Sequence, residues 1–239
     1  MIEQDRNHYA FQGTKIGHSD LKKIEADFRH KMPWYAHFLK KYLPVDLNAP
    51  ILDVPCGHGN FLYFLKHQGY RNVRGIDGEP RRIAIAHQLG LSVAELGDAF
   101  DAVQKADDIA MIVCLDFLEH IEKFQVPEFL RDCRQALRKG GVLIVRLPFT
   151  DSLLGAHDLG NDFTHKWAAN SGVIEGLFLE AGFTHVVVKD ERPVPYKPLN
   201  YIRLFIFHLM KALTNAYLIL VGLGPLKIWS RSGYVIGIK

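Results

Sequence analysis

The chain has 239 residues, 48% of them hydrophobic, and a formal net charge of +3. This apolar fraction is ordinary for a globular protein and argues against a disordered chain, and the small net charge, with acids and bases mixed along the chain, is too little to imply nucleic-acid binding. Cys56, Cys114 and Cys133 lie far apart without a CxxC pair, so we expect reduced thiols in a cytosolic compartment. The polar N-terminus holds no apolar core of signal-peptide length, so we expect no secretion by that route.

The first predicted elements are two helices within residues 19–43, where apolar side chains recur at helical intervals. Ser19 is the expected cap of the first helix, and Pro33 is the expected break before the second. Together they predict an N-terminal helical cap over residues 1–50.

Residues 51–190 alternate short apolar strands with helices, and one more strand closes the chain. The predicted strands are 51–54, 73–77, 109–115, 142–148, 184–190 and 234–239. The predicted helices are 61–70, 79–90, 126–141 and 171–183. Gly140 is expected to end the helix 126–141. Such alternation indicates βαβ units around a parallel sheet, and hence an α/β fold.

The segment 194–232 interrupts this alternation with a long apolar stretch. Its polar side chains fall within an arc of roughly 140° at about 100° per residue, which predicts an amphipathic helix over 201–221; they are Arg203, His208, Lys211, Thr214 and Asn215. The uncharged run 212–226 is shorter than the roughly 20 residues that span a bilayer, so a transmembrane helix is not expected. Packing on the domain, peripheral contact with anionic lipid and a homodimer surface remain open for this helix.

A glycine-rich turn follows the first strand and indicates a nucleotide-type ligand. Gly57 and Gly59 form a turn through which a ligand can reach the backbone, and Asp77 ends the second strand, where a carboxylate can accept ribose hydrogen bonds. Many nucleotide-binding α/β proteins share this pattern. Leu62 stands where dinucleotide-binding proteins need a small residue, which disfavours a pyrophosphate, and no GK[ST] follows, which excludes a P-loop.

Five segments resemble, in order, the motifs of class I S-adenosylmethionine methyltransferases. They are ILDVPCGHGN, RGID, LGDAF, LDFLEHI and LRKGGVLIVRLP, within residues 51–148. The resemblance implies a Rossmann-like class I methyltransferase domain over 51–239, with a mostly parallel seven-stranded sheet, an antiparallel last strand and a helical insertion (194–232) before it. It also implies S-adenosyl-L-methionine as cofactor and S-adenosyl-L-homocysteine as product.

The same resemblance implies a set of cofactor-binding residues. They are Asp53, Pro55, Gly57, Gly59, Asp77, Gly78, Asp98, Ala99, Leu115 and Asp116. Of these, Asp98 and Ala99 are expected to lie beside the adenine. Pro55 stands where the family has a glycine, which removes one backbone donor beside the methionine end of the cofactor.

The segment HDLGNDFTHKW (157–167) contains the residues that we expect to bind the substrate. The alternative interpretation is a solvated polar loop. The NDFTH stretch is similar to a segment in methyltransferases of bacterial surface-polysaccharide gene clusters, although the preceding Arg-Tyr pair of those proteins is missing here. That resemblance implies a saccharide hydroxyl as acceptor. The implied substrate-binding residues are His157, Asn161, Asp162 and His165.

A hydroxyl acceptor must lose a proton as it attacks, and a histidine can take that proton near neutral pH. His165 is the first candidate for this base and His120 the second, with Asp162 to orient a histidine or bind a sugar hydroxyl. We expect no metal, because the aspartates and histidines of 157–165 match no metal motif and hard cations prefer more oxygen ligands.

Two other functions fit the sequence. LEHI is shared with enzymes that methylate small non-sugar acceptors such as quinone precursors, and the apolar 201–221 segment fits a non-catalytic cofactor-binding or membrane-docking module. A nucleic-acid acceptor is not expected, because no NPPY-like motif follows the fourth strand. We therefore expect a cytoplasmic enzyme, with peripheral contact at the inner membrane left open.

Overall fold

The computed structural model describes residues 21–153, 155, 157, 160 and 162–239. In this part of the chain, a seven-stranded sheet runs in the order β3-β2-β1-β4-β5-β7-β6. The strands are β1 (Ile51–Asp53), β2 (Val73–Asp77), β3 (Ala94–Leu96), β4 (Ile109–Leu115), β5 (Leu137–Pro148), β6 (His185–Asp190) and β7 (Ser232–Ile238). Strands β1 to β5 pair in parallel, and β7 lies antiparallel between β5 and β6. The expected mostly parallel sheet with an antiparallel last strand is confirmed.

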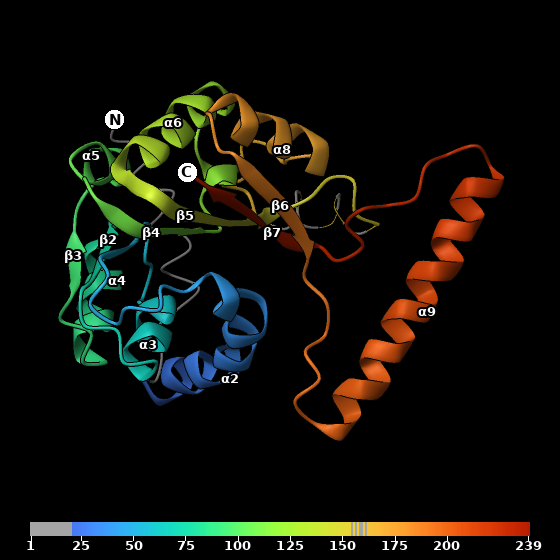
Figure 1. The fold of residues 1–239 in the computed structure, drawn as a ribbon. Helices are drawn as coiled ribbons and strands as arrows, with labels where there is room; N and C mark the ends of the chain where they lie inside the picture. The colour runs from blue at the N-terminus through green and yellow to red at the C-terminus, as the bar shows by residue number, and fades with distance from the viewer. Residues whose placement is uncertain (1–20, 154, 156, 158–159, 161) are drawn as a thin grey trace.

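Helices cover both faces of this sheet (Figure 1). The α-helices are α2 (Leu21–Leu39), α3 (Asn60–His67), α4 (Pro80–Gln88), α5 (Ala99–Gln104), α6 (Val126–Ala136), α8 (Ser171–Glu180) and α9 (Pro198–Leu220). Short 3₁₀ turns are η1 (Lys40–Tyr42), η2 (Leu118–His120) and η3 (Lys123–Gln125). Helices α5, α6 and α8 lie on one face, and α2, α3 and α4 lie on the other.

The central strand β4 shows how an uninterrupted apolar run serves both layers. Ile112 and Cys114 point into the core cluster under α6 and α8, whereas Met111 and Val113 point into the cluster under α2 and α3. Successive strand residues face opposite sides, so a strand covered on both faces needs apolar side chains at every position. This run therefore places β4 at the centre of the sheet.

The predicted break at Pro33 is wrong, because α2 continues through it from Leu21 to Leu39. Buried side chains lie on both sides of the proline: Phe28 precedes it, and Tyr35 and Phe38 follow it. Packing of both halves on the domain compensates for the backbone hydrogen bond that proline cannot donate. Ser19, the predicted cap, lies outside the described residues.

The predicted helix 126–141 is also wrong over its last five residues. Helix α6 ends at Ala136, and β5 begins at Leu137, which pairs with Ile109 before the register shifts. Gly140 has a left-handed φ of +75°, so it marks an irregular start of the strand rather than the end of a helix. Strand β3 has no counterpart in the prediction, because its three residues, of which only Ala94 is buried, carry no apolar run.

Helix α9 leaves the sheet edge after β6 and returns to it before β7 (Figure 1). The predicted amphipathic helix is present, and it presents its polar side to the domain. Lys211 Nζ lies 2.7 Å from Asp190 Oδ2, and Asn215 Oδ1 accepts a hydrogen bond from the Leu226 amide at 2.9 Å. By length and composition, α9 could also cross a bilayer. The expectation from sequence counted only the uncharged run after Lys211, whereas an apolar stretch long enough to span a bilayer can include this one lysine.

Candidate active site

The turn between β1 and α3 brings the backbone within reach of a ligand. Gly57 and Gly59 both have left-handed φ values, +57° and +87°. A Cβ on Gly59 would come within 2.5 Å of Leu91 Cδ1, whereas a Cβ on Gly57 would meet open space. Gly59 therefore serves packing, and Gly57 offers open backbone to a ligand. Pro55 lies in the same turn after a cis peptide bond.

The bulky Leu62 packs against a glycine on the neighbouring strand. A Cβ on Gly75 in β2 would lie 2.5 Å from Leu62 Cδ1. In dinucleotide-binding folds the third glycine of the turn permits close packing of helix and strand. Here the small residue is on the strand instead, so α3 approaches β2 without a glycine at position 62.

Two aspartates end β1 and β2 beside this turn. Asp53 is buried, and its Oδ2 has no hydrogen-bond partner among the described residues. Burial raises the pKa of Asp53, and the nearby charge of Asp77 raises it further. Asp77 accepts hydrogen bonds from the amides of Gly57 and Glu79, each at 2.9 Å. A glycine turn with an unsatisfied carboxylate oxygen and an oriented second carboxylate fits the methionine and ribose ends of S-adenosylmethionine.

The loops after β2 and β3 lie side by side, which brings the predicted adenine-side residues together. The Gly97 amide donates to the Asp77 carbonyl at 3.0 Å, and a Cβ on Gly78 would lie 3.7 Å from the Gly97 carbonyl oxygen. Asp98 caps α5 by accepting from the amides at 100 and 101, and Ala99 is the first residue of that helix. This capping role of Asp98 was not predicted, and its contact with adenine stays a prediction.

Sequence reasoning missed an ionic cluster at the ends of β4 and β5. Leu115 ends β4, and Asp116, which has an uncommon left-handed φ of +52°, pairs with Arg146 Nη1. Arg146 Nη2 also lies 2.7 Å from Glu191 Oε2. A signal was present in the sequence, because Arg146 interrupts the otherwise apolar run 142–148. The cluster holds Asp116 at the edge of the cofactor region.

Helix α2 contributes to the same region through Tyr35. Burial raises the pKa of Tyr35, with Arg146 opposing the shift and Asp116 and Asp53 adding to it. The Tyr35 ring also packs edge-on against Phe61 at 5.1 Å between centroids. The N-terminal helix therefore lies against the candidate site rather than apart from it.

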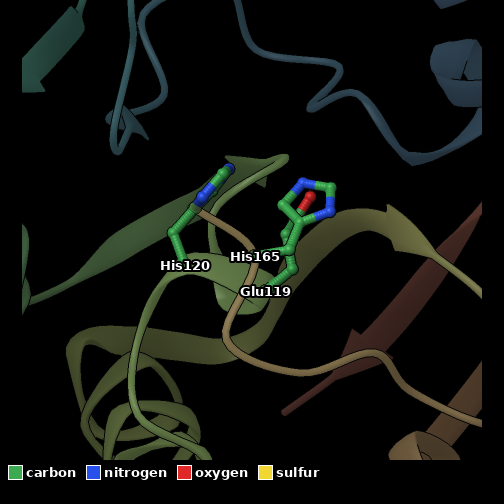
Figure 2. A group of neighbouring side chains, drawn as sticks. All are labelled: Glu119, His120 and His165. Carbon is green, nitrogen blue, oxygen red and sulfur yellow. The ribbon is translucent and has the colours of Figure 1, made fainter. Parts of the chain in front are cut away.

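Two hydrogen bonds to backbone carbonyls attach Lys166 and Trp167 to η2. The Lys166 amide donates to the Glu119 carbonyl at 2.8 Å, and Trp167 Nε1 donates to the Leu118 carbonyl at 2.7 Å. As a result, His120 and His165 lie together, with 4.9 Å between ring centroids (Figure 2). The structure thus joins the two histidines that the sequence proposed separately.

A hydrogen-bonded chain links Asp162, Thr164 and His120. Thr164 Oγ1 donates to Asp162 Oδ1 at 2.7 Å and lies 2.8 Å from His120 Nδ1. Because a hydroxyl has one hydrogen to give, His120 Nδ1 must be the donor to Thr164. The proton on Nδ1 leaves the lone pair of neutral His120 on Nε2, the form that can accept a proton.

Burial, neighbouring charge and hydrogen bonding together determine the protonation states of His120 and Asp162. Burial lowers the pKa of His120, and the neighbouring His165 lowers it further. Burial raises the pKa of Asp162, but the hydrogen bonds from the Thr164 amide and hydroxyl outweigh it and leave a net lowering. His120 is therefore held neutral, and Asp162 is held ionised.

Glu119 is a buried carboxylic acid that sequence reasoning also missed, although it lies within the LEH motif. Burial raises its pKa, the charge of Asp116 adds to the shift, and its Oε2 has no hydrogen-bond partner among the described residues. Ligand atoms of Glu119, His120 and His165 all lie within 4.8 Å of one another (Figure 2). Two imidazoles and one carboxylate form a donor set that suits zinc, iron or manganese.

The predicted substrate-binding residues differ in their exposure. His165 is half-buried beside His120, whereas His157 is exposed. Asn161 lies outside the described residues. The binding roles of His157, Asn161, Asp162 and His165 stay predictions, as does the absence of a metal.

Comparisons with known proteins identify methyltransferases among the similar chains. A family model described as "Methyltransferase domain" matches residues 28–188. A ubiquinone biosynthesis O-methyltransferase of Rickettsia bellii (strain OSU 85-389) is 29% identical over 99 residues, which cover 40% of this chain and 40% of the relative.

Solved structures share the fold. A SAM-dependent methyltransferase from Archaeoglobus fulgidus superimposes with a TM-score of 0.65 at 18% identity, covering 97% of this chain and all of that one. Phosphoethanolamine N-methyltransferase 2 of Haemonchus contortus, in complex with S-adenosyl-L-methionine, gives a TM-score of 0.59 at 14% identity over 85% of this chain and 51% of that one. The family model covers more than half of the sequence, so the chain belongs to this methyltransferase family, with the class I fold of S-adenosylmethionine-dependent enzymes.

Proposed function

We propose that this methyltransferase moves a methyl group from S-adenosylmethionine to a hydroxyl oxygen, and that His120 takes the hydroxyl proton. The observation that carries this proposal is the chain from Asp162 through the Thr164 hydroxyl to Nδ1 of His120. It orients a neutral imidazole with its basic nitrogen, Nε2, available to an acceptor.

S-adenosylmethionine supplies the methyl group, whose carbon–sulfur bond breaks as the oxygen–carbon bond forms. Asp53, Gly57 and Asp77 would bind and orient this donor, since such a displacement depends on positioning. His120 Nε2 accepts the proton as the acceptor oxygen becomes more nucleophilic. Ionised Asp162 stabilises the resulting imidazolium through Thr164, and the adjacent His165 positions the acceptor.

For the acceptor we favour a saccharide hydroxyl, as on a nucleotide sugar or a surface-glycan residue. The similarity of NDFTH to the polysaccharide-cluster methyltransferases supports this choice, and the contacts of Asp162 and Thr164 give that segment a place beside His120. A quinone precursor is the second candidate, because the Rickettsia bellii relative is named a ubiquinone biosynthesis enzyme. A methyl-transfer assay against panels of sugar nucleotides and catechols separates the two.

The Glu119, His120 and His165 group supports a second chemistry at the same site. The unpartnered, buried Oε2 of Glu119 would be satisfied by a cation that the two imidazoles also bind. Such a cation would polarise the acceptor hydroxyl and lower its pKa, which makes a protein base unnecessary.

The test compares His120→Ala and His165→Ala with His185→Ala, a change at an exposed histidine at the start of β6. We expect His120→Ala to lower kcat by about 10² to 10⁴, with the affinity for S-adenosylhomocysteine unchanged by calorimetry. EDTA should leave the wild-type rate unchanged. Full activity of His120→Ala would refute the base, and a loss in EDTA that zinc or manganese restores would establish the cation mechanism instead.

A further inference from the structure

Helix α9 exposes a continuous apolar surface to the surroundings. The side chains at its outward positions are exposed; they are Ile202, Phe205, Ile206, Leu209, Leu213 and Leu220. These positions recur at three- and four-residue intervals, so at about 100° per residue they share one face of the helix. Exposed apolar surfaces of this extent mark contact with a membrane or another protein.

The opposite side of α9 is already engaged by the domain. Lys211 is bound to Asp190 and to the Lys227 carbonyl, and the Phe207 ring packs edge-on against Trp229 at 5.0 Å between centroids. Lys227 and Trp229 belong to the segment that returns to β7, and Asp190 ends β6. The helix is therefore held with its polar side inward, an orientation that leaves the apolar face available for an external partner.

Charge identifies that partner. The segment 192–231 contains no Asp or Glu and six basic residues, namely Arg192, Lys197, Arg203, Lys211, Lys227 and Arg231. Of these, Lys197 and Arg203 are exposed at the start of α9, whereas Lys211 and Lys227 are paired with Asp190 and Glu175. A second copy of this chain would present the same sign of charge, which disfavours self-association. Anionic lipid is complementary both to the apolar face and to the basic residues around it.

The sheet topology determines how the helix meets the bilayer. Strands β6 and β7 flank α9 in the sequence, and they pair with each other from Asp190↔Gly233 to His185↔Ile238. If α9 crossed the membrane, residues 221–231 would have to recross roughly 30 Å of hydrocarbon without secondary structure, leaving backbone groups unsatisfied. A helix lying in the plane of the interface avoids this cost.

We propose that α9 seats this enzyme on an anionic membrane surface, as an in-plane helix whose apolar face enters the lipid. The tyrosines Tyr201 and Tyr217 are exposed along the helix and suit the headgroup level. This inference does not depend on the identity of the methyl acceptor. It places the active site at a membrane surface, where a lipid-linked acceptor would be presented.

The experiment is co-sedimentation of the full chain with vesicles of phosphatidylglycerol and phosphatidylcholine (1:1) and with vesicles of phosphatidylcholine alone. We expect binding to the anionic vesicles that is at least tenfold stronger, and that 0.5 M NaCl weakens. The double variant Phe205→Asp/Leu213→Asp should lower the bound fraction at least tenfold. The matched control is Phe124→Asp, because Phe124 is 77% exposed and Phe205 is 67% exposed, and it should bind as the wild type does.

A second pair of variants tests the charge. Arg203→Glu should weaken binding severalfold, whereas Arg71→Glu, at an exposed position between α3 and β2, should not. S-adenosylhomocysteine affinity and thermal melting establish that each variant is folded. Absence of binding to anionic vesicles, equal binding to neutral vesicles, or wild-type binding by the double variant would overturn the proposal. So would a dimer in light scattering that Phe205→Asp dissociates without any effect on vesicle binding.

Discussion

The Thr164 hydroxyl accepts a hydrogen bond from His120 Nδ1 at 2.8 Å while it donates its own hydrogen to Asp162. One residue from the loop before α8 therefore determines the tautomer of a histidine on η2, 44 residues away in the sequence. This contact leaves Nε2 as the basic nitrogen of neutral His120.

Thr164→Val removes this hydroxyl while keeping the side-chain volume. In this variant Nδ1 keeps only the more distant Thr164 carbonyl, at 3.3 Å, so the tautomer of His120 with its proton on Nδ1 is held less firmly and Nε2 is less often the basic nitrogen. We expect kcat to fall about tenfold, the effect of losing roughly 1.4 kcal/mol of orientation. The matched control is Thr184→Val, which removes a hydroxyl that binds the Ile238 carbonyl and should leave kcat unchanged. Equal losses in the two variants would contradict the role of Thr164.

The rate should depend on pH through His120. A base must be neutral, and burial together with His165 lowers the pKa of His120 below its ordinary value of 6.5. Activity should therefore be constant at neutral pH and decline as the pH falls through that lowered pKa. Asp162 acts to raise the pKa of His120, so Asp162→Asn should move the inflection of kcat/KM to still lower pH. An inflection above 6.5 in the wild type would contradict the assignment.

The glycine turn offers a stability test with a built-in comparison. Gly59→Ala places a methyl group 2.5 Å from Leu91 Cδ1 at a φ of +87°, whereas Gly140→Ala meets nothing within 4 Å at a φ of +75°. Left-handed φ alone costs about 1 kcal/mol, and overpacking adds about 1–3 kcal/mol. In urea unfolding we expect Gly140→Ala to lose about 1 kcal/mol and Gly59→Ala about 3 kcal/mol. Equal losses would show that Leu91 yields without cost.

Arg146 and Arg74, both on strands, allow a half-buried ion cluster to be compared with an exposed ion pair. Arg146, with 25% of its side chain exposed, binds Asp116 and Glu191, whereas Arg74 binds Glu95 with both side chains at least half exposed. Arg146→Met leaves the largely buried Glu191 without its cation and should lower the free energy of unfolding by about 3 kcal/mol. Arg74→Met should lower it by less than about 1 kcal/mol. Unfolding of both variants in urea measures the difference.

The sequence by itself determined the central sheet and the cofactor turn, because these depend on local patterns. The apolar run of β4 predicts a strand covered on both faces, and the glycine pair predicts a tight turn, in which Gly57 has open backbone and Gly59 packs against Leu91. Where the local pattern was ambiguous, prediction failed: helical periodicity runs past Ala136 into residues that pair as β5. Strand pairing overrides such periodicity, since Leu137 pairs with Ile109 of β4 and the ladder continues from Val142.

Tertiary structure alone decided which side chains act together. Asp162, Thr164 and His120 form one hydrogen-bonded chain because Lys166 and Trp167 attach their loop to η2, a contact between segments that no spacing rule connects. The same holds for α9, whose periodicity predicts an apolar and a polar face but not which one faces the domain. Asp190 and the return segment hold the polar side inward, because the half-buried Lys211 cation is paired there, and this leaves the apolar face outward.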